Sequence, residues 1–401
     1  MGSITVDYTT LSLSQQVLER QRAHASAIQQ YLPANADIGD STGALLSLFD
    51  PLSQAAVAVA GEAAGILGSI ELAAAASVGD TARHFADSDG KVGDSFSKLI
   101  ARLGATAPDG GYPDLGGPTL GSAGESAPGD YGSVDSNIIE KAQGTVDTIT
   151  DSAGTAAELI ARIGQLGAPT AVTEMTDASS YLVAPQCPEN PVQDLRWSAG
   201  ALLGGIDWVA EQFIGFSILD RCVFHPLAGD WEGIYRGSEA WAHAGDAAKG
   251  IAQNHAGLVA STPTTWEGLS GDSFRGAMTG VAGGALGLSE AYGTASGLIK
   301  TLSTVCKLAC TGIGMALKWV ADTLIEMAAE AATPVIGWAV GAFKAYDQIQ
   351  GVITKVKLGY TILETIASAI QDFVEAKTAI LDKLGLLEDL LSGLGKSTVP
   401  A

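Results

Sequence analysis

The chain has 401 residues, of which 44 are acidic and 22 are basic, so its formal net charge is −22. A chain this acidic repels phosphate backbones, which argues against binding to nucleic acid. Glycine contributes 50 residues, and only 16% of the residues are charged. This composition is typical of thin helical bundles whose backbones approach closely, and the length leaves room for two or three such units.

The first part of the chain, residues 1–103, is expected to form an N-terminal helical hairpin. A first helix is expected to stop at Pro33, because proline has no backbone N–H and disfavours helix in the residue before it. An alanine-rich helix is expected over residues 45–77, followed by a further helical segment over residues 78–103.

Two linkers and one helix are expected in the middle of the chain. Residues 104–133 are rich in glycine and proline, so we expect them to bury too little apolar area to order themselves. An apolar stripe predicts a helix over residues 134–168. Residues 169–194, which contain the sequence Cys-Pro-Glu-Asn-Pro, are expected to form a second linker.

The clearest pattern lies in residues 195–331. Two stretches of apolar residues recur at steps of three and four, which places one apolar seam on each of two helices. Pro263 breaks the helix between them, so the seams are expected to fold back as an antiparallel hairpin with Trp266 and Gly268 at its bend. The seam residues are Trp241, Ala244, Ala248, Ile251, His255 and Leu258, then Phe274, Met278, Val281, Ala285, Leu288, Tyr292, Ala295, Ile299 and Leu302. In this seam, His255 is expected to be a hydrogen-bonded core histidine.

The second hairpin helix is expected to reach about Ala331, and residues 332–401 predict further apolar helices. After Leu394 only a short tail remains, so no catalytic toxin domain is expected there. No segment shows a convincing alternation of apolar and polar residues, which argues against strands. The expected fold is therefore all-α, with antiparallel helical hairpins and bundles in two units joined by linkers rich in glycine and proline.

Motifs that carry catalytic chemistry are missing from the sequence. It contains neither a Gly-x-Ser-x-Gly nucleophile elbow nor a His-Glu-x-x-His zinc motif, so no enzymatic activity, cofactor or metal is expected. Cys187 and Cys222 can form a disulfide in an oxidising compartment; the alternative is that buried thiols act as small hydrophobic groups. A zinc site can also be drawn from four residues, but their spacing matches no zinc-finger pattern. These four residues are Cys222, His225, Cys306 and Cys310.

Membrane insertion is an alternative that the sequence leaves open. The N-terminus has no basic region followed by an apolar stretch, so no general secretory signal peptide is expected. No run of eighteen or more uncharged apolar residues exists. Residues 302–343 nevertheless carry glycines at spacings found in contacts between membrane helices, including Gly337 and Gly341. A membrane-active or pore-forming protein is therefore the alternative function.

The hairpin with Trp266 and Gly268 at its bend resembles the WXG family of type VII (ESX) secretion substrates. The aromatic segment and the sequence Leu-Ala-Gly-Asp-Trp-Glu-Gly that come before this hairpin look like the WXG-like N-terminal modules of large actinobacterial effectors. Trp231 begins an earlier copy of the tripeptide, which precedes the first hairpin helix, so we expect that copy to start a helix.

A second match lies in the first unit. Residues 1–103 are similar to small helical-hairpin secretion-associated proteins of mycobacterial ESX systems. In those proteins the second helix ends with an aromatic residue, three further residues and an acid. Phe85 and Asp89 have this spacing, with phenylalanine in place of the usual tyrosine.

The resemblance to the WXG family covers roughly residues 195–380. It implies export by a type VII secretion system as a folded hairpin, to the cell surface or the medium, without a cleavable signal peptide. It also implies pairing with another helical hairpin, WXG-like or a second copy, and recognition by a secretion ATPase or chaperone that reads the bend and the helix end together. The Trp266 ring is expected to pack in the groove of the partner helix, and Gly268 lets the chain reverse without a Cβ clash.

Overall fold

The computed structural model describes residues 6–87 (without 45), 117–133, 152–165, 171–187 and 224–331, with a few isolated positions between 203 and 219. All regular elements in these residues are helices, and extended pairing among them is limited to three isolated bridges. The prediction of an all-α fold built from antiparallel helical hairpins is therefore confirmed.

The first hairpin consists of α1 (Tyr8–Asn35) and α2 (Asp50–Asp87), which pack along each other. Asp7 caps α1, because its carboxylate accepts a hydrogen bond from the Thr9 amide at 3.0 Å. Alanine and glycine dominate the contact face of α2, so the two backbones come close, as the composition predicts.

Both helices of this hairpin are longer than predicted. α1 continues past Pro33 to Asn35. A proline this close to the helix end removes only one backbone hydrogen bond, and the Ala36 amide closes the last turn on the Leu32 carbonyl at 2.8 Å. α2 runs without the break predicted after Ser77. The hydroxyls of Ser77 and Thr81 donate to carbonyls one turn earlier, at 3.0 and 2.8 Å, so these polar residues fit inside a continuous helix.

The second hairpin consists of α9 (Trp231–Ser261) and α10 (Leu269–Ala331). Asp230 caps α9 by accepting a hydrogen bond from the Glu232 amide at 3.1 Å, so the first Trp-Glu-Gly copy starts a helix, as predicted. The end of α9 before Pro263 and the length of α10 also agree with the sequence pattern.

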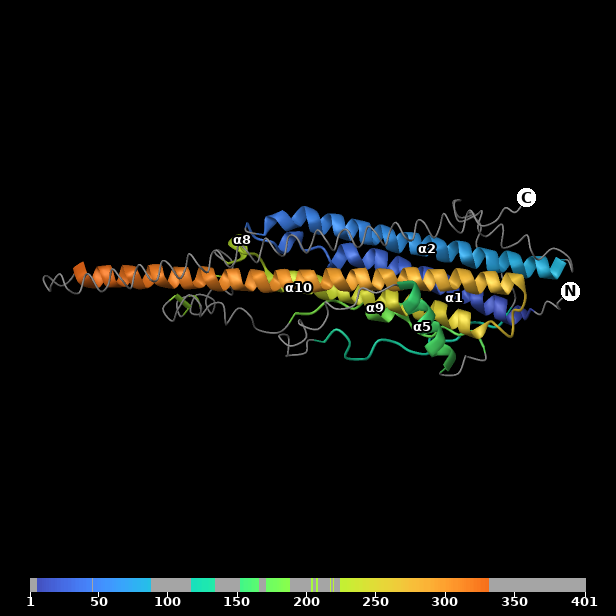
Figure 1. Ribbon diagram of the computed structural model, residues 1–401. Helices are drawn as coiled ribbons and strands as arrows, with labels where there is room; N and C mark the ends of the chain where they lie inside the picture. Colours follow the sequence, from blue (N-terminus) through green and yellow to red (C-terminus); the bar gives the residue numbers. More distant parts are fainter. Residues whose placement is uncertain are drawn as a thin grey trace.

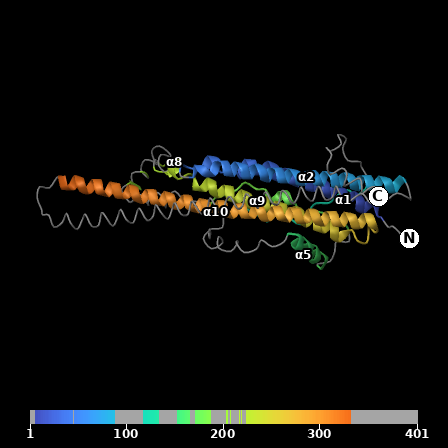
Figure 2. The ribbon, with the colours of Figure 1, turned by 45° about the horizontal axis from the view of Figure 1, so that its top comes forward.

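The two hairpins lie side by side and form one elongated bundle (Figure 1). α1 contacts α9, α2 contacts α10, and buried residues from all four helices belong to one hydrophobic core. The Ser303 hydroxyl donates to the Trp231 carbonyl at 2.8 Å, which places Ser303 beside the start of α9. The rest of α10 therefore extends past α9, as both views show (Figure 2).

Parts of the two predicted linkers are packed on the bundle. In residues 117–133 Leu120 is buried, and in residues 171–187, which we call the strap, Val172 is buried. The two segments also pair with each other through backbone hydrogen bonds of 2.8–3.0 Å. The sequence predicts that residues 104–133 bury too little apolar area to order themselves. The described residues 117–133 are packed because α1 and α9 supply the apolar and polar partners that this segment lacks.

Short elements complete the described part of the chain. α5 (Ser152–Gln165) packs on α9 and α10, inside the region 134–168 that the sequence predicts as helix. The other short elements are η1 (Gly39–Ser41), η2 (Ser47–Phe49), η3 (Ala178–Tyr181) and α8 (His225–Leu227). The predicted C-terminal helices over 332–401 lie outside the described residues.

Candidate functional site at the bend and between the hairpins

The bend between α9 and α10 depends on glycine. Gly268 has a φ of 101°, in the left-handed region where a side chain is strained. A Cβ at Gly271 would collide with the backbone carbonyl of Trp266. The Trp266 amide donates to the Thr262 carbonyl at 2.9 Å, which closes the turn. Both glycines are therefore needed for this backbone path.

Trp266 is an internal anchor of the bend. Its side chain is fully buried, and its ring stacks on Phe274 with 4.8 Å between the ring centroids. The indole N–H donates to the Ser270 hydroxyl at 3.1 Å, and the Trp266 carbonyl accepts from Arg275 at 3.0 Å. All of these partners lie in the first two turns of α10, so Trp266 fixes how that helix begins.

The start of the chain covers the bend from the outside. Val6 forms an antiparallel bridge with Trp266, and the Asp7 amide donates to the Thr265 carbonyl at 2.9 Å. The Trp266 side chain is thus buried within this chain, and its expected packing in the groove of a partner helix stays a prediction.

The end of α2 lies at the same end of the bundle as the bend. α1 starts beside the bend, and α2 runs antiparallel to α1, so its last described residue, Asp87, returns to that end (Figure 1). Phe85 belongs to the last turn of α2. The side chain of Phe85 and the whole of Asp89 lie outside the described residues, so their role stays a prediction.

The opposite end of the bundle also connects the hairpins. Thr42, in the loop between α1 and α2, forms an antiparallel bridge with Gly229, just before α9. The Asp230 amide donates to the Ser41 carbonyl at 2.7 Å. A Cβ at Gly43 would collide with the backbone of residues 227–229, so the two loops are in close contact.

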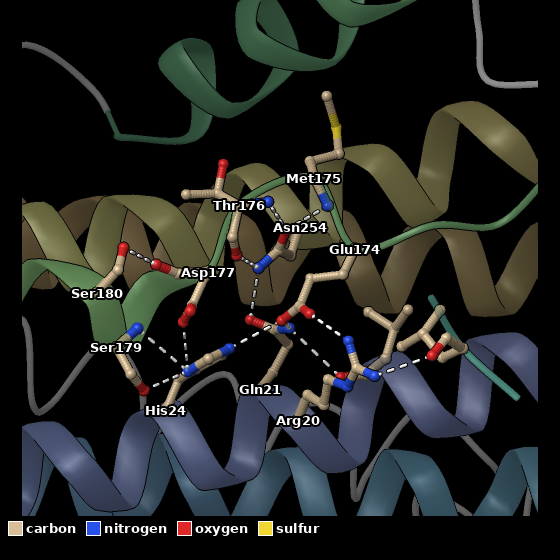
Figure 3. Close-up of polar contacts among 12 residues, drawn as sticks. Arg20, Gln21, His24, Glu174, Met175, Thr176, Asp177, Ser179, Ser180 and Asn254 are labelled. Atoms are coloured by element: carbon tan, nitrogen blue, oxygen red, sulfur yellow. Dashed lines mark hydrogen bonds and ion pairs between the residues drawn. The ribbon is translucent and has the colours of Figure 1, made fainter. Parts of the chain in front are cut away.

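Between these two ends, the hairpins are connected through Glu174, a strap residue whose carboxylate points at α1 (Figure 3). The Glu174 side chain is only 3% exposed, and it accepts hydrogen bonds from Arg20 at 2.7 Å, His24 at 2.8 Å and Gln21 at 3.3 Å. Burial would raise the pKa of Glu174, but the hydrogen bonds from His24 and Arg20 outweigh burial and hold the pKa below its usual value. The carboxylate is therefore charged at neutral pH and holds the strap on α1.

Asn254 connects the strap to α9 in the same region (Figure 3). Its side-chain oxygen accepts from the amides of Met175 and Thr176, both at 2.8 Å. Its side-chain nitrogen donates to the Thr176 carbonyl and to the Gln21 side chain, again at 2.8 Å. This uses the full hydrogen-bonding capacity of the amide, so α1, the strap and α9 are joined by one satisfied polar network.

His24 stands between a serine and an acid. Its Nδ1 accepts from the Ser179 hydroxyl at 2.5 Å, and its Nε2 faces Glu174. The order of serine, histidine and acid is that of a hydrolase triad. However, Nδ1 also accepts the Ser179 amide at 3.2 Å, so the ring satisfies a backbone donor in the first turn of η3. We therefore interpret His24 as a structural residue that holds the strap.

A buried carboxylate–imidazole contact connects α2 and α9. Glu71 and His255 have fully buried side chains, and Glu71 Oε1 lies 2.5 Å from His255 Nε2. This confirms the prediction that His255 is a hydrogen-bonded core histidine. Among the described residues, Glu71 Oε2 and His255 Nδ1 have no hydrogen-bond partner. The pair therefore carries a large desolvation cost inside the hydrophobic core.

Tyrosine side chains hold residues 117–133 and the strap on α9 and α1. The Tyr131 hydroxyl donates to Asp246 at 2.6 Å, and the Tyr31 hydroxyl donates to the Val183 carbonyl at 2.7 Å. The Tyr31 hydroxyl also lies 3.0 Å from His243 Nδ1. Burial lowers the pKa of His243, so the neutral ring is favoured at this site.

The cysteines behave as thiols in the described part of the chain. The Cys187 thiol is half-buried, and burial raises its pKa to about 12. Cys222 lies outside the described residues, so a disulfide between the two stays a prediction. Cys306 and Cys310 are buried, as expected of small hydrophobic groups. No group of three or more potential metal ligands occurs where side chains are described.

Comparisons with family models, with characterised proteins and with solved structures found no match to this chain. Its class is therefore defined by geometry: an all-α bundle in which two hairpins of one chain are connected at both ends and between them.

The sequence pattern predicts the bend but does not predict the polar contact between the two hairpins. A signal was available in α1, where Gln21 and His24 lie between Val17 and Ile28 at steps of four, three and four. Polar residues at apolar spacing predict a polar contact inside a core. Glu174 had no such signal, because it lies in a segment without periodicity.

Proposed function

We propose that this chain is a non-enzymatic helical protein exported by a type VII (ESX) secretion system, and that it leaves the cell as a bundle already paired within one chain. One observation carries the proposal: the α9–α10 hairpin, with Trp-Glu-Gly at its bend, packs against a second hairpin of the same chain. α1 and α2 then take the place of the separate hairpin partner that the WXG resemblance implies.

Pairing within the chain is supported by specific contacts in addition to apolar burial. Thr42–Gly229 at one end, Val6–Trp266 at the other, and Asn254 with Gln21 between them set the register of the two hairpins. Pairing in one chain avoids the loss of translational and rotational freedom that a separate partner would suffer. A separate hairpin partner is therefore not needed to bury these faces.

The position of the two motifs also supports the proposal. The bend and the last turn of α2, which carries Phe85, occur at the same end of the bundle. A secretion ATPase that approached this end would meet both motifs at once.

The proposal is tested by export of the double variant Trp266→Ala, Gly268→Ala from the native host. We expect its level in the culture supernatant to fall at least about tenfold, a loss that corresponds to about 1.4 kcal/mol of recognition. The wild type should need the secretion motor. Trp241→Ala is the matched control, because Trp241 is also fully buried but lies in α9 against Tyr292, away from the bend. Equal loss of export in the control would mean that instability, and not the bend, limits export.

A second candidate function, membrane activity, has one observation in its favour. Two described helices are long and apolar enough to cross a membrane by length and composition, within Asp50–Ala82 and Leu269–Lys318. About half of each apolar window is buried in the bundle, as in the core helices of many proteins without membrane spans. If the membrane reading holds, the purified chain should release dye from liposomes. Absence of release between pH 5 and pH 7 would contradict it.

A further inference from the structure

The contact between Glu71 and His255 crosses the centre of the bundle. α1 lies against α2 and α9, and α10 lies against the same two helices, so α2 and α9 stand at opposite corners. Glu71, on α2, nevertheless meets His255, on α9, with 2.5 Å between Oε1 and Nε2 and with both side chains fully buried. This contact therefore joins the first hairpin to the second through the core.

The apolar residues around this contact do not distinguish one apolar partner from another. Buried apolar side chains lie one helical turn before and after the contact on both helices, namely Leu67, Ala74, Ile251 and Leu258. Apolar residues at steps of three and four still meet apolar residues when one helix moves by a heptad. Such a shift of α2 would bring Ala64 or Val78 opposite His255, so apolar packing by itself does not fix the pairing.

The two polar groups depend on each other. Among the described residues, Glu71 Oε2 and His255 Nδ1 have no hydrogen-bond partner. Gln21 and Asn254, which also connect the hairpins, differ in this respect, because both of them also bond to the strap. A hairpin with an apolar side chain at the central position would leave Glu71 or His255 buried alone, which lowers the pairing equilibrium by at least about 100-fold.

We propose that Glu71 and His255 select the partner of each hairpin, so that the first hairpin pairs with the second hairpin of this sequence and not with other apolar hairpins. The chemistry defines the accepted partner: a helical hairpin whose apolar face carries one imidazole opposite Glu71, or one carboxyl group opposite His255. A mismatch at a buried polar group is an effective way to exclude a wrong partner. The inference goes beyond the proposed function, because it concerns pairing and not export.

The test is exchange of hairpins between two full-length chains. Glu71→Leu and His255→Phe, each with a different affinity tag, are unfolded together and refolded by dilution. Each variant alone leaves one polar group unpaired. In an exchanged dimer the two substituted positions face each other and the intact Glu71 faces the intact His255, so both mismatches are removed.

We expect this complementary mixture to form dimers that carry both tags. Two hairpins of one chain meet at an effective concentration on the order of 1 mM, which is roughly the dissociation constant of an exchanged wild-type dimer. Two restored contacts, each of about 100-fold, lower that constant to about 0.1 µM. Light scattering and tag co-purification at about 10 µM chain should therefore detect dimers in the complementary mixture and not in co-refolded wild type.

Two controls separate partner selection from general loss of stability. Glu62→Leu mixed with Lys249→Phe is the matched control, because both positions are exposed on the same two helices. The double variant Glu71→Leu, His255→Phe in one chain has no mismatch and should also remain unexchanged.

A complementary mixture that gives no more mixed dimer than these controls would overturn the inference, whether or not the single variants fold alone. That result would leave the proposed function intact. The proposed function fails in a different way: the wild-type chain would still reach the supernatant after deletion of the motor.

Discussion

Replacing Glu71 alone with leucine is expected to lower the free energy of unfolding by about 3–5 kcal/mol, because it leaves the His255 ring fully buried without its hydrogen-bond partner. Replacing both residues, as in Glu71→Leu with His255→Phe, should restore most of that loss. Removal of both polar groups also removes their desolvation cost, and apolar substitutes for buried ion pairs are often neutral or stabilising. Chemical denaturation of the wild type, the two single variants and the double variant measures the coupling energy directly.

Glu62→Leu is the matched control for the Glu71 prediction. Glu62 lies on the same helix but is exposed, so its replacement should change the stability by no more than about 0.5 kcal/mol. If the double variant is as unstable as Glu71→Leu, the α2–α9 contact does not accept apolar side chains at this position and our account of the pair is wrong.

Glu174→Gln is expected to lower the free energy of unfolding by about 1.5–3 kcal/mol, because Arg20, Gln21 and His24 lose their charged acceptor. The loss of unfolding free energy should not exceed this range, because Arg20 is 37% exposed and water can solvate its guanidinium group. The strap should also become more accessible, and faster amide hydrogen exchange at Met175 and Thr176 would report its release from Asn254.

The same residue predicts a pH dependence. The folded-state pKa of Glu174 lies below its ordinary value of 4.5, so its contribution to stability is complete above about pH 4.5 and is lost as the pH falls through the folded-state pKa. The acid-induced loss of stability should therefore be smaller in Glu174→Gln than in the wild type. Glu125→Gln, on the neighbouring segment but exposed, should follow the wild-type curve. Parallel curves for wild type and Glu174→Gln would show that this carboxylate is not linked to folding.

The helices themselves were largely predictable from the sequence. The apolar seams, Pro263 and the two Trp-Glu-Gly copies predict where α9 and α10 begin, end and reverse, because these signals act through local backbone chemistry. The errors in the first hairpin have the same origin. Pro33 is a local signal for a break, but so near the end of α1 it removes only one backbone hydrogen bond. α2 runs through Ser77, whose hydroxyl donates to a carbonyl one turn earlier.

The candidate site was predictable only in part. The sequence identifies Trp266 and Gly268 by their motif and by the turn between the two seams. In the structure Gly268 has the left-handed φ of that turn, and the Trp266 ring stacks on Phe274. That Trp266 is covered by Val6 and Asp7 depends on residues about 260 positions away in sequence, as the bridge between Val6 and Trp266 shows. No spacing rule reports such a contact.

The sequence by itself determined that this protein is an acidic, all-α chain with a glycine-dependent bend between two long apolar seams. Helix periodicity, proline and glycine are sufficient for that, because each acts within a few residues. Only the tertiary structure decided that the two hairpins pair with each other, that the strap lies on α1 and α9, and that Leu269 is exposed where Trp266 is buried. These facts depend on which polar and apolar groups meet after the chain has folded, and a polar residue such as Glu174 acquires its role only when Arg20 and His24 are brought to it.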